Sequence, residues 1–161
     1  VDCQLILAGG TADDDPESVD VVEQVRRKAE GDPDIHVLLM PQNDIHINAL
    51  QRASSVIVQK SLREGFGLTV TEALWKAKPV VASAVGGITV QIKHRHHGLL
   101  CHSADGAALA IKQLLQNPPY ARRLGENGKE HVRQNFLLTR HLRDYLLLFL
   151  SLYSAEDIIY L

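Results

Sequence analysis

The sequence is poor in cysteine, in net charge and in long apolar runs, and each shortage excludes a class of protein. Its two cysteines, Cys3 and Cys101, lie too far apart in the chain for a metal-binding or redox motif, so we expect reduced thiols in a cytoplasmic protein. A net charge of −2 provides no electrostatic attraction to nucleic acid or to an anionic membrane. The longest apolar run, residues 145–153, is far shorter than the roughly 20 residues that span a bilayer.

What remains is an ordinary globular composition, with 45% hydrophobic and 22% charged residues in a chain of 161. This length suits one domain that buries its own core, which we place at residues 1–153, followed by a tail at 154–161. The chain opens directly on an apolar run and does not begin with Met. We therefore expect it to be a piece of a longer protein.

One stretch organises the chain, and it reads as strand, loop, helix and strand. The apolar run at residues 56–58 predicts a buried strand, residues 68–77 have helical spacing, and residues 80–82 predict the next strand. Further strands are expected at 3–8, 35–40 and 98–101, and helices at 16–30, 44–53, 88–92, 104–116, 119–135 and 138–152. This alternation predicts a Rossmann-like three-layer α/β domain with a parallel sheet.

The loop before the helix at residues 68–77 has the features of an anion site. The first-turn N–H groups of a helix lack intrahelical partners, and Gly65 and Gly67 let a ligand approach the backbone closely. Glu64 and Glu72 would repel a bare phosphate, but carboxylates accept hydrogen bonds from hydroxyl groups. Glu72 lies roughly 7 Å further along the helix axis than Gly67. A ligand with a diphosphate centre and hydroxyl-rich ends, such as a nucleotide sugar, fits both carboxylates.

The same residues carry a resemblance to a known family. The motif EGFGLTVTE, from Glu64 to Glu72, resembles the E-x7-E donor-binding motif of retaining GT-B glycosyltransferases of family four. The wider segment 61–88, SLREGFGLTVTEALWKAKPVVASAVGGI, is similar to that of trehalose synthases, which use NDP-glucose. The resemblance extends over residues 1–153 and implies the C-terminal, nucleotide-sugar-binding half of a GT-B fold.

The resemblance implies a hexosyltransferase that moves glucose from NDP-glucose to glucose with retention. Glu64 would be the catalytic-site residue that accepts hydrogen bonds from the hexose, Glu72 would bind the ribose, and the backbone of residues 65–68 would hold the diphosphate. For Arg63, an ion pair with Glu64, a contact with the diphosphate and plain solvent exposure all stay open. The full implied donor-binding set is Pro41, Arg63, Glu64, Gly65, Phe66, Gly67, Leu68, Thr69 and Glu72.

Parts of the resembled enzymes have no counterpart in this sequence. The Arg and Lys that neutralise the diphosphate lie upstream of the first strand in the family, and the N-terminal domain holds the acceptor pocket. We therefore expect the chain alone to be inactive, with a nucleotide-sugar donor, a sugar acceptor and an N-terminal GT-B domain as its partners. No cofactor is expected, and Mg²⁺ is compatible with the sequence but not required by it. The apolar helix at 138–152 would brace the N-terminal domain, pack on its own sheet or form a homodimer contact.

Other interpretations stay open. A trehalose phosphorylase-like enzyme shares the fold and the disaccharide, and a nucleotide-binding module without catalysis would use the same loop. The histidines offer a metal site as a further alternative. His94, His96 and His97 follow one another closely, but neighbouring side chains cannot easily face one ion, so we predict no metal and a solvated basic loop.

Overall fold

The computed structural model describes residues 1–10, 17–40 and 44–153. The chain forms two compact units, Val1–Ala53 and Ser54–Leu161, each of which is described by itself. Pro41, one of the predicted donor-binding residues, and the tail at 154–161 lie outside the described residues.

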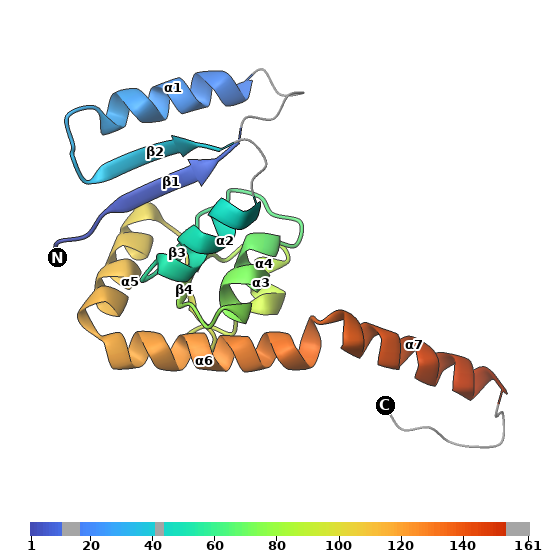
Figure 1. The fold of residues 1–161 in the computed structure, drawn as a ribbon. Coiled ribbons are helices and arrows are strands. Elements are labelled where there is room, and N and C mark those ends of the chain that lie inside the picture. The colour runs from blue at the N-terminus through green and yellow to red at the C-terminus, as the bar shows by residue number, and fades with distance from the viewer. Residues whose placement is uncertain (11–16, 41–43, 154–161) are drawn as a thin grey trace. The chain divides into compact units, whose positions relative to one another are not determined.

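The first unit contains a two-stranded parallel sheet. Strand β1 (Leu5–Gly9) pairs with β2 (Ile35–Leu39) in a register that begins at Leu5 opposite Ile35. Helix α1 (Glu17–Ala29) connects the two strands and contacts β2, as a parallel crossover requires (Figure 1). Helix α2 (Asp44–Ala53) completes the unit and has the predicted bounds.

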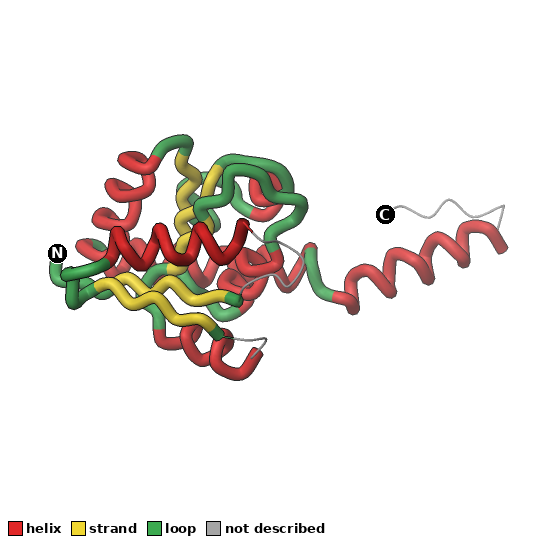
Figure 2. Tube along the Cα trace, turned by 90° about the horizontal axis from the view of Figure 1, so that it is seen from above, coloured by secondary structure: helices red, strands yellow, loops and turns green. Residues whose placement is uncertain are grey.

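The second unit is built on a three-stranded parallel sheet in the order β3, β4, β5. The strands are β3 (Ile57–Gln59), β4 (Val80–Ser83) and β5 (Leu99–Cys101) (Figure 2, strands in yellow). Every residue of the central strand β4 is buried. A strand that reads as a continuous apolar run is typical of a parallel sheet that is covered on both faces.

Both faces of this sheet are covered by helices, which gives three layers. Val80 and Ala82 of β4 pack in one core with α3 (Leu68–Trp75) and α4 (Ile88–Gln91). Val81, which points to the opposite face, packs in a second core with α5 (Ala104–Gln116). The alternation of side chains along β4 therefore separates the two cores. The predicted α/β fold with parallel sheets is confirmed.

Helix α6 (Pro118–Asn135) contains two interior glycines, Gly125 and Gly128. Glycine ordinarily weakens the interior of a helix, yet this helix is continuous. A Cβ atom on Gly128 would lie 2.5 Å from Cδ2 of Leu74, and one on Gly125 would lie well under 3.0 Å from the Ala77 carbonyl oxygen. The two glycines thus let α6 approach α3, and the closeness of this packing offsets their low helix propensity.

Helix α3 ends two residues earlier than the sequence predicts. Ala77 has a φ of 56°, in the left-handed region. Its N–H donates to the Leu74 carbonyl at 2.9 Å, and the N–H of Lys78 donates to the Ala73 carbonyl at 3.0 Å. This pair of bonds is a Schellman motif, which satisfies the last carbonyls of the helix.

Helix α7 (Leu138–Tyr153) buries none of its residues. Its apolar side chains are about half exposed, for example Leu148 at 51% and Phe149 at 52%. An ion pair of 2.8 Å joins Arg140 to Asp144 along the helix. Of the alternatives left open for this helix, packing on the sheet of its own domain does not agree with this exposure. Within the described part of the chain, the helices fall short of the length and apolar character that crossing a bilayer demands.

Candidate functional site

The loop between β3 and α3 fixes the carboxylate of Glu64. Gln59, the last residue of β3, donates from Nε2 to Ser61 Oγ at 2.9 Å and to Glu64 Oε2 at 3.3 Å. The hydroxyl of Ser61 donates to the same carboxylate oxygen at 3.1 Å. Glu64 is half-buried as a result of its place in this loop. Its carboxylate is therefore held in one orientation by the carboxyl end of a parallel strand, where ligands bind in open α/β sheets.

The N-terminus of α3 follows directly and is open to an anion. Gly67 occupies the N-cap position with φ 86° and ψ 65°, a left-handed conformation that favours glycine, and no side chain caps the helix. The first turn contains no acidic residue. Its N–H groups and the helix dipole therefore present partial positive charge, and the carboxylate beside them is that of Glu64, whose Cδ lies 3.6 Å from the place of a Cβ atom on Gly67.

Gly86 and Gly87, in the loop after β4, pack against the loop between β3 and α3. A Cβ atom on Gly86 would overlap the Glu64 carbonyl oxygen, and Gly86 itself has a φ of 48°. The N–H of Gly87 donates to the Gly65 carbonyl at 2.9 Å. Gly86 and Gly87 therefore allow backbone-to-backbone contact between the loop after β4 and the loop after β3.

Gln91 is a buried residue of this site that the sequence analysis missed. Its side chain has 0% exposure, and its Nε2 donates to the carbonyl oxygen of Phe66 and, at 3.3 Å, to that of Gly67. Its Oε1 accepts a hydrogen bond of 2.6 Å from the Thr71 hydroxyl on α3. The available signal was a polar residue directly between two apolar ones, Val90 and Ile92.

The other predicted donor-binding residues lie on the outside of the same structure. Gly65, Phe66 and Arg63 are exposed on the loop, and Leu68 and Thr69 are exposed on the first turn of α3. Glu72 is exposed one turn further along α3. The fold thus gathers all of the predicted residues that lie within the described ranges onto one loop and the helix that follows it. Their individual roles stay predictions.

The expectation of a solvated basic loop is confirmed for Lys93, His94, Arg95 and His96, which are exposed, and is wrong for His97. His97 is 9% exposed, and its ring stacks on that of His131 from α6 with centroids 4.0 Å apart. Burial, followed by the neighbouring charges of His131 and His96, lowers the pKa of His97 from 6.5 to about 4. Within the described part of the chain, no group of three His, Cys, Asp or Glu side chains is placed to hold a metal ion.

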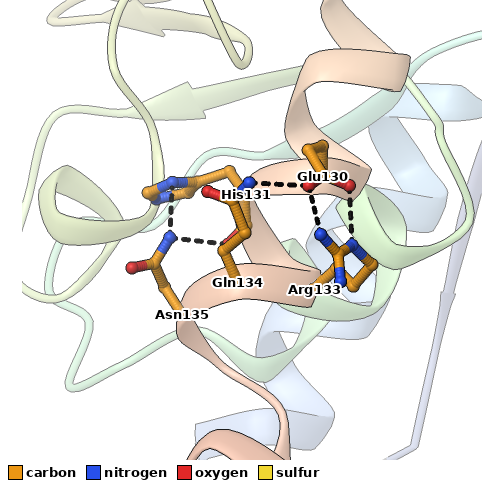
Figure 3. A network of polar contacts seen from close by, with 5 residues as sticks. All are labelled: Glu130, His131, Arg133, Gln134 and Asn135. Atoms are coloured by element: carbon orange, nitrogen blue, oxygen red, sulfur yellow. Dashed lines mark hydrogen bonds and ion pairs between the residues drawn. The ribbon is translucent and has the colours of Figure 1, made fainter.

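His131 is itself held by polar contacts at the end of α6. Its Nδ1 lies 3.1 Å from Nδ2 of Asn135, and burial lowers its pKa (Figure 3). Beside it, Arg133 donates two hydrogen bonds to Glu130, which lower the pKa of that carboxyl to about 2. Phe136 connects this region to the loop, because its ring contacts both His131 and Phe66 edge-on.

The fold and the site together define a Rossmann-like α/β domain with an anion-attracting helix terminus beside a fixed carboxylate. The chain belongs to the family of glycosyl transferases group 1, which it matches over residues 1–131. It is 51% identical over 151 residues to a trehalose synthase of Rubrobacter xylanophilus, an alignment that covers 92% of this chain and 36% of the relative. It is also 41% identical over 116 residues to a trehalose phosphorylase of Grifola frondosa, covering 69% and 16% of the two chains.

The fold agrees with these relationships. The structure matches sucrose-phosphate synthase from Thermosynechococcus elongatus with a TM-score of 0.79 at 29% identity, over 95% of this chain and 39% of that one. The predicted likeness to GT-B glycosyltransferases and to trehalose synthases is thereby confirmed. The chain spans about a third of the length of the trehalose synthase it matches.

Proposed function

We propose that this chain is the donor-binding domain of a retaining glycosyltransferase that transfers glucose from an NDP-glucose to glucose and forms trehalose. One observation carries the proposal: the carboxylate of Glu64 is fixed by Gln59 and Ser61 directly beside the uncapped N-terminus of α3. A hydroxyl acceptor and an anion site are thus adjacent, as a sugar diphosphate requires. The identity of 51% with a trehalose synthase supports glucose and trehalose over other sugars.

Each part of the nucleotide-sugar donor is assigned to a group of this chain that has complementary chemistry. Glu64 accepts hydrogen bonds from hexose hydroxyls, and the amides of residues 65–68 hold the diphosphate together with Arg63. Glu72 binds the ribose, and the segment around Pro41 contacts the base. Because the amides, the helix dipole and Arg63 offset part of the charge of the diphosphate, the proposal does not require a metal ion for leaving-group stabilisation.

The transfer proceeds on one face of the sugar. The bond between the anomeric carbon and the diphosphate oxygen breaks as the acceptor oxygen forms a new bond to the same carbon on the same side. The acceptor proton passes to the departing phosphate oxygen, so no protein nucleophile is needed. The acceptor pocket belongs to an N-terminal GT-B domain, and this chain alone binds the donor without turning it over.

Calorimetric titration of the chain with ADP-glucose, UDP-glucose and GDP-glucose tests the proposal. We expect one of them to bind with a Kd in the millimolar range or below, and Glu64→Gln and Glu72→Gln each to weaken that binding. Glu126→Gln, on the exposed side of α6, is the matched control and should bind as the parent chain does. Equal binding by the parent chain and both site variants, or turnover of NDP-glucose and glucose by the chain alone, would contradict the proposal.

The identity of 41% with a trehalose phosphorylase favours one second candidate. A phosphorylase of this type transfers glucose to inorganic phosphate and therefore has to accommodate glucose 1-phosphate in place of a nucleotide sugar. Titration with α-glucose 1-phosphate separates the two candidates. Binding of glucose 1-phosphate, without binding of any of the three nucleotide sugars, would favour the phosphorylase.

A further inference from the structure

Three successive carbonyl groups of the loop before α3 are bound from the same side. The carbonyl of Gly65 accepts a hydrogen bond from the N–H of Gly87, and the carbonyls of Phe66 and Gly67 accept from Nε2 of Gln91. All of these donors belong to the segment from Gly87 to the end of α4. Residues 87–91 therefore form a template segment, which fixes the conformation of the loop backbone by hydrogen bonds.

The template segment determines the direction of the N–H groups of the loop before α3. In a planar trans peptide the C=O and N–H bonds are directed to opposite sides. Carbonyls 65 and 66 are turned toward Gly87 and Gln91, and carbonyl 67 accepts both from Gln91 and from the N–H of Val70 in α3, so the N–H groups of Phe66, Gly67 and Leu68 are turned away from these donors. Consecutive N–H groups that point to one side form an anion-binding concavity.

Gln91 is suited to this task by its chemistry and its burial. A carboxamide offers two donors and an acceptor, and here it uses them on two carbonyls of the loop and the hydroxyl of Thr71. The side chain is 0% exposed, so water does not compete for these groups. A side chain of the same size without the amide would remove this donor from the Phe66 carbonyl, while the Gly67 carbonyl would keep the hydrogen bond of 2.9 Å that it accepts from the N–H of Val70 in α3.

We propose that Gln91 is a positioning residue, which orients the amides of Phe66, Gly67 and Leu68 toward the diphosphate of the donor without touching the ligand. This inference rests on the proposed function, because it assigns the amides to the donor. It adds that the affinity for the donor depends on Gln91, a buried residue of α4 that lies 20 positions beyond Thr71 in the chain.

The test replaces Gln91 by Met, whose side chain has a similar volume but lacks the amide group that donates and accepts these hydrogen bonds. Q91M should lower the affinity for whichever of ADP-glucose, UDP-glucose and GDP-glucose binds the parent chain by about tenfold to a hundredfold. Q113M, on the exposed side of α5, is the matched control and should bind unchanged. T71V, which removes only the hydroxyl that donates to Gln91, should lower the affinity by a smaller factor of roughly two to ten. This milder variant keeps the test decisive if Q91M does not fold.

A spectroscopic measurement separates positioning from plain stability. In ¹⁵N-labelled chain, inorganic pyrophosphate should shift the amide resonances of residues 66–68 in the parent and in Q113M. In T71V, and in Q91M where it folds, these shifts should shrink even at a temperature where circular dichroism shows a fully folded variant. Undiminished shifts in the folded variants, or pyrophosphate shifts that leave residues 66–68 unchanged in the parent, would overturn the inference.

The two proposals fail in different ways. If no nucleotide sugar binds the parent chain but pyrophosphate shifts amides 66–68 in a Gln91-dependent way, the proposed function fails and the positioning role stands. If a nucleotide sugar binds the parent, Q91M and T71V equally well, the positioning role fails and the proposed function stands.

Discussion

Strands β1 and β4 are both short, apolar and parallel to their partners, yet their burial is opposite. All four residues of β4 are buried, whereas all five residues of β1 are exposed, with Leu5 at 45% and Leu7 at 38%. β4 has a strand on each side and a helix-built core on each face, while β1 pairs with a single strand. The burial of an apolar strand therefore depends on the strands and helices that pack against it, and its composition alone does not decide it.

Truncation of one leucine in each unit should sharpen this comparison most. Leu74→Ala empties a position with 0% exposure and should lower the free energy of unfolding by about 2–5 kcal/mol. Leu7→Ala, at 38% exposure, should lower it by about 1 kcal/mol. Trp75 is the only tryptophan and lies in the second unit, so its fluorescence during denaturation reports Leu74→Ala, while circular dichroism, to which both units contribute, reports Leu7→Ala. Equal losses of unfolding free energy in both variants would contradict the comparison.

Two glycines of the site provide a second, smaller test. Gly86→Ala forces a Cβ atom onto the Glu64 carbonyl oxygen and should destabilise the second unit by roughly 1–3 kcal/mol. Gly65→Ala meets no protein atom within 4 Å and should leave the denaturation midpoint nearly unchanged.

Gly65→Ala also tests where the diphosphate of the ligand binds. Because a Cβ on Gly65 touches nothing in the protein, a loss of nucleotide-sugar affinity in Gly65→Ala would come from the ligand itself. We expect such a loss in calorimetric titration, since the amides around Gly65 are assigned to the diphosphate. Unchanged affinity in Gly65→Ala would place the diphosphate elsewhere.

The pH dependence of stability should show the smallest of these effects. The pKa of His97 is about 4 in the folded chain and 6.5 in the unfolded one, so between these values the unfolded state binds more protons. Stability is therefore full above about pH 6.5 and falls as the pH drops toward 4. We expect a loss of about 1–2 kcal/mol between pH 7 and pH 5. The groups that face His97 are His131, His96 and Lys93, and the pKa of His131 is lowered in the same direction.

Urea denaturation of two phenylalanine variants at pH 7 and pH 5 checks this prediction. His97→Phe keeps an aromatic ring against His131 but cannot be protonated, so its stability should depend less on pH than that of the parent. His102→Phe, at an exposed position, should keep the pH dependence of the parent. A parent-like pH dependence in His97→Phe would refute the assignment.

Much of the fold could be predicted because the signals are local. Helices α2 and α5 have the predicted bounds, since apolar spacing and, for α5, the Ser103 cap act within a few residues of each end. The motif from Glu64 to Glu72 was equally visible, because its glycines and glutamates lie on one loop and the helix after it. The end of α3 was misplaced because a left-handed Ala77 is stabilised by the surrounding packing and has no marker in its own sequence.

By itself, the sequence determined the order of strands and helices, the anion-attracting loop and the family of glycosyltransferases. These properties depend on residues that are neighbours in the chain. Only the tertiary structure decided that Gly125 and Gly128 are packing contacts, that His97 is buried against His131, and that Gln91 holds the loop carbonyls. Each of these depends on atoms 20 or more residues apart in the chain, and the spacing of residue types along one segment carries no record of what packs against it.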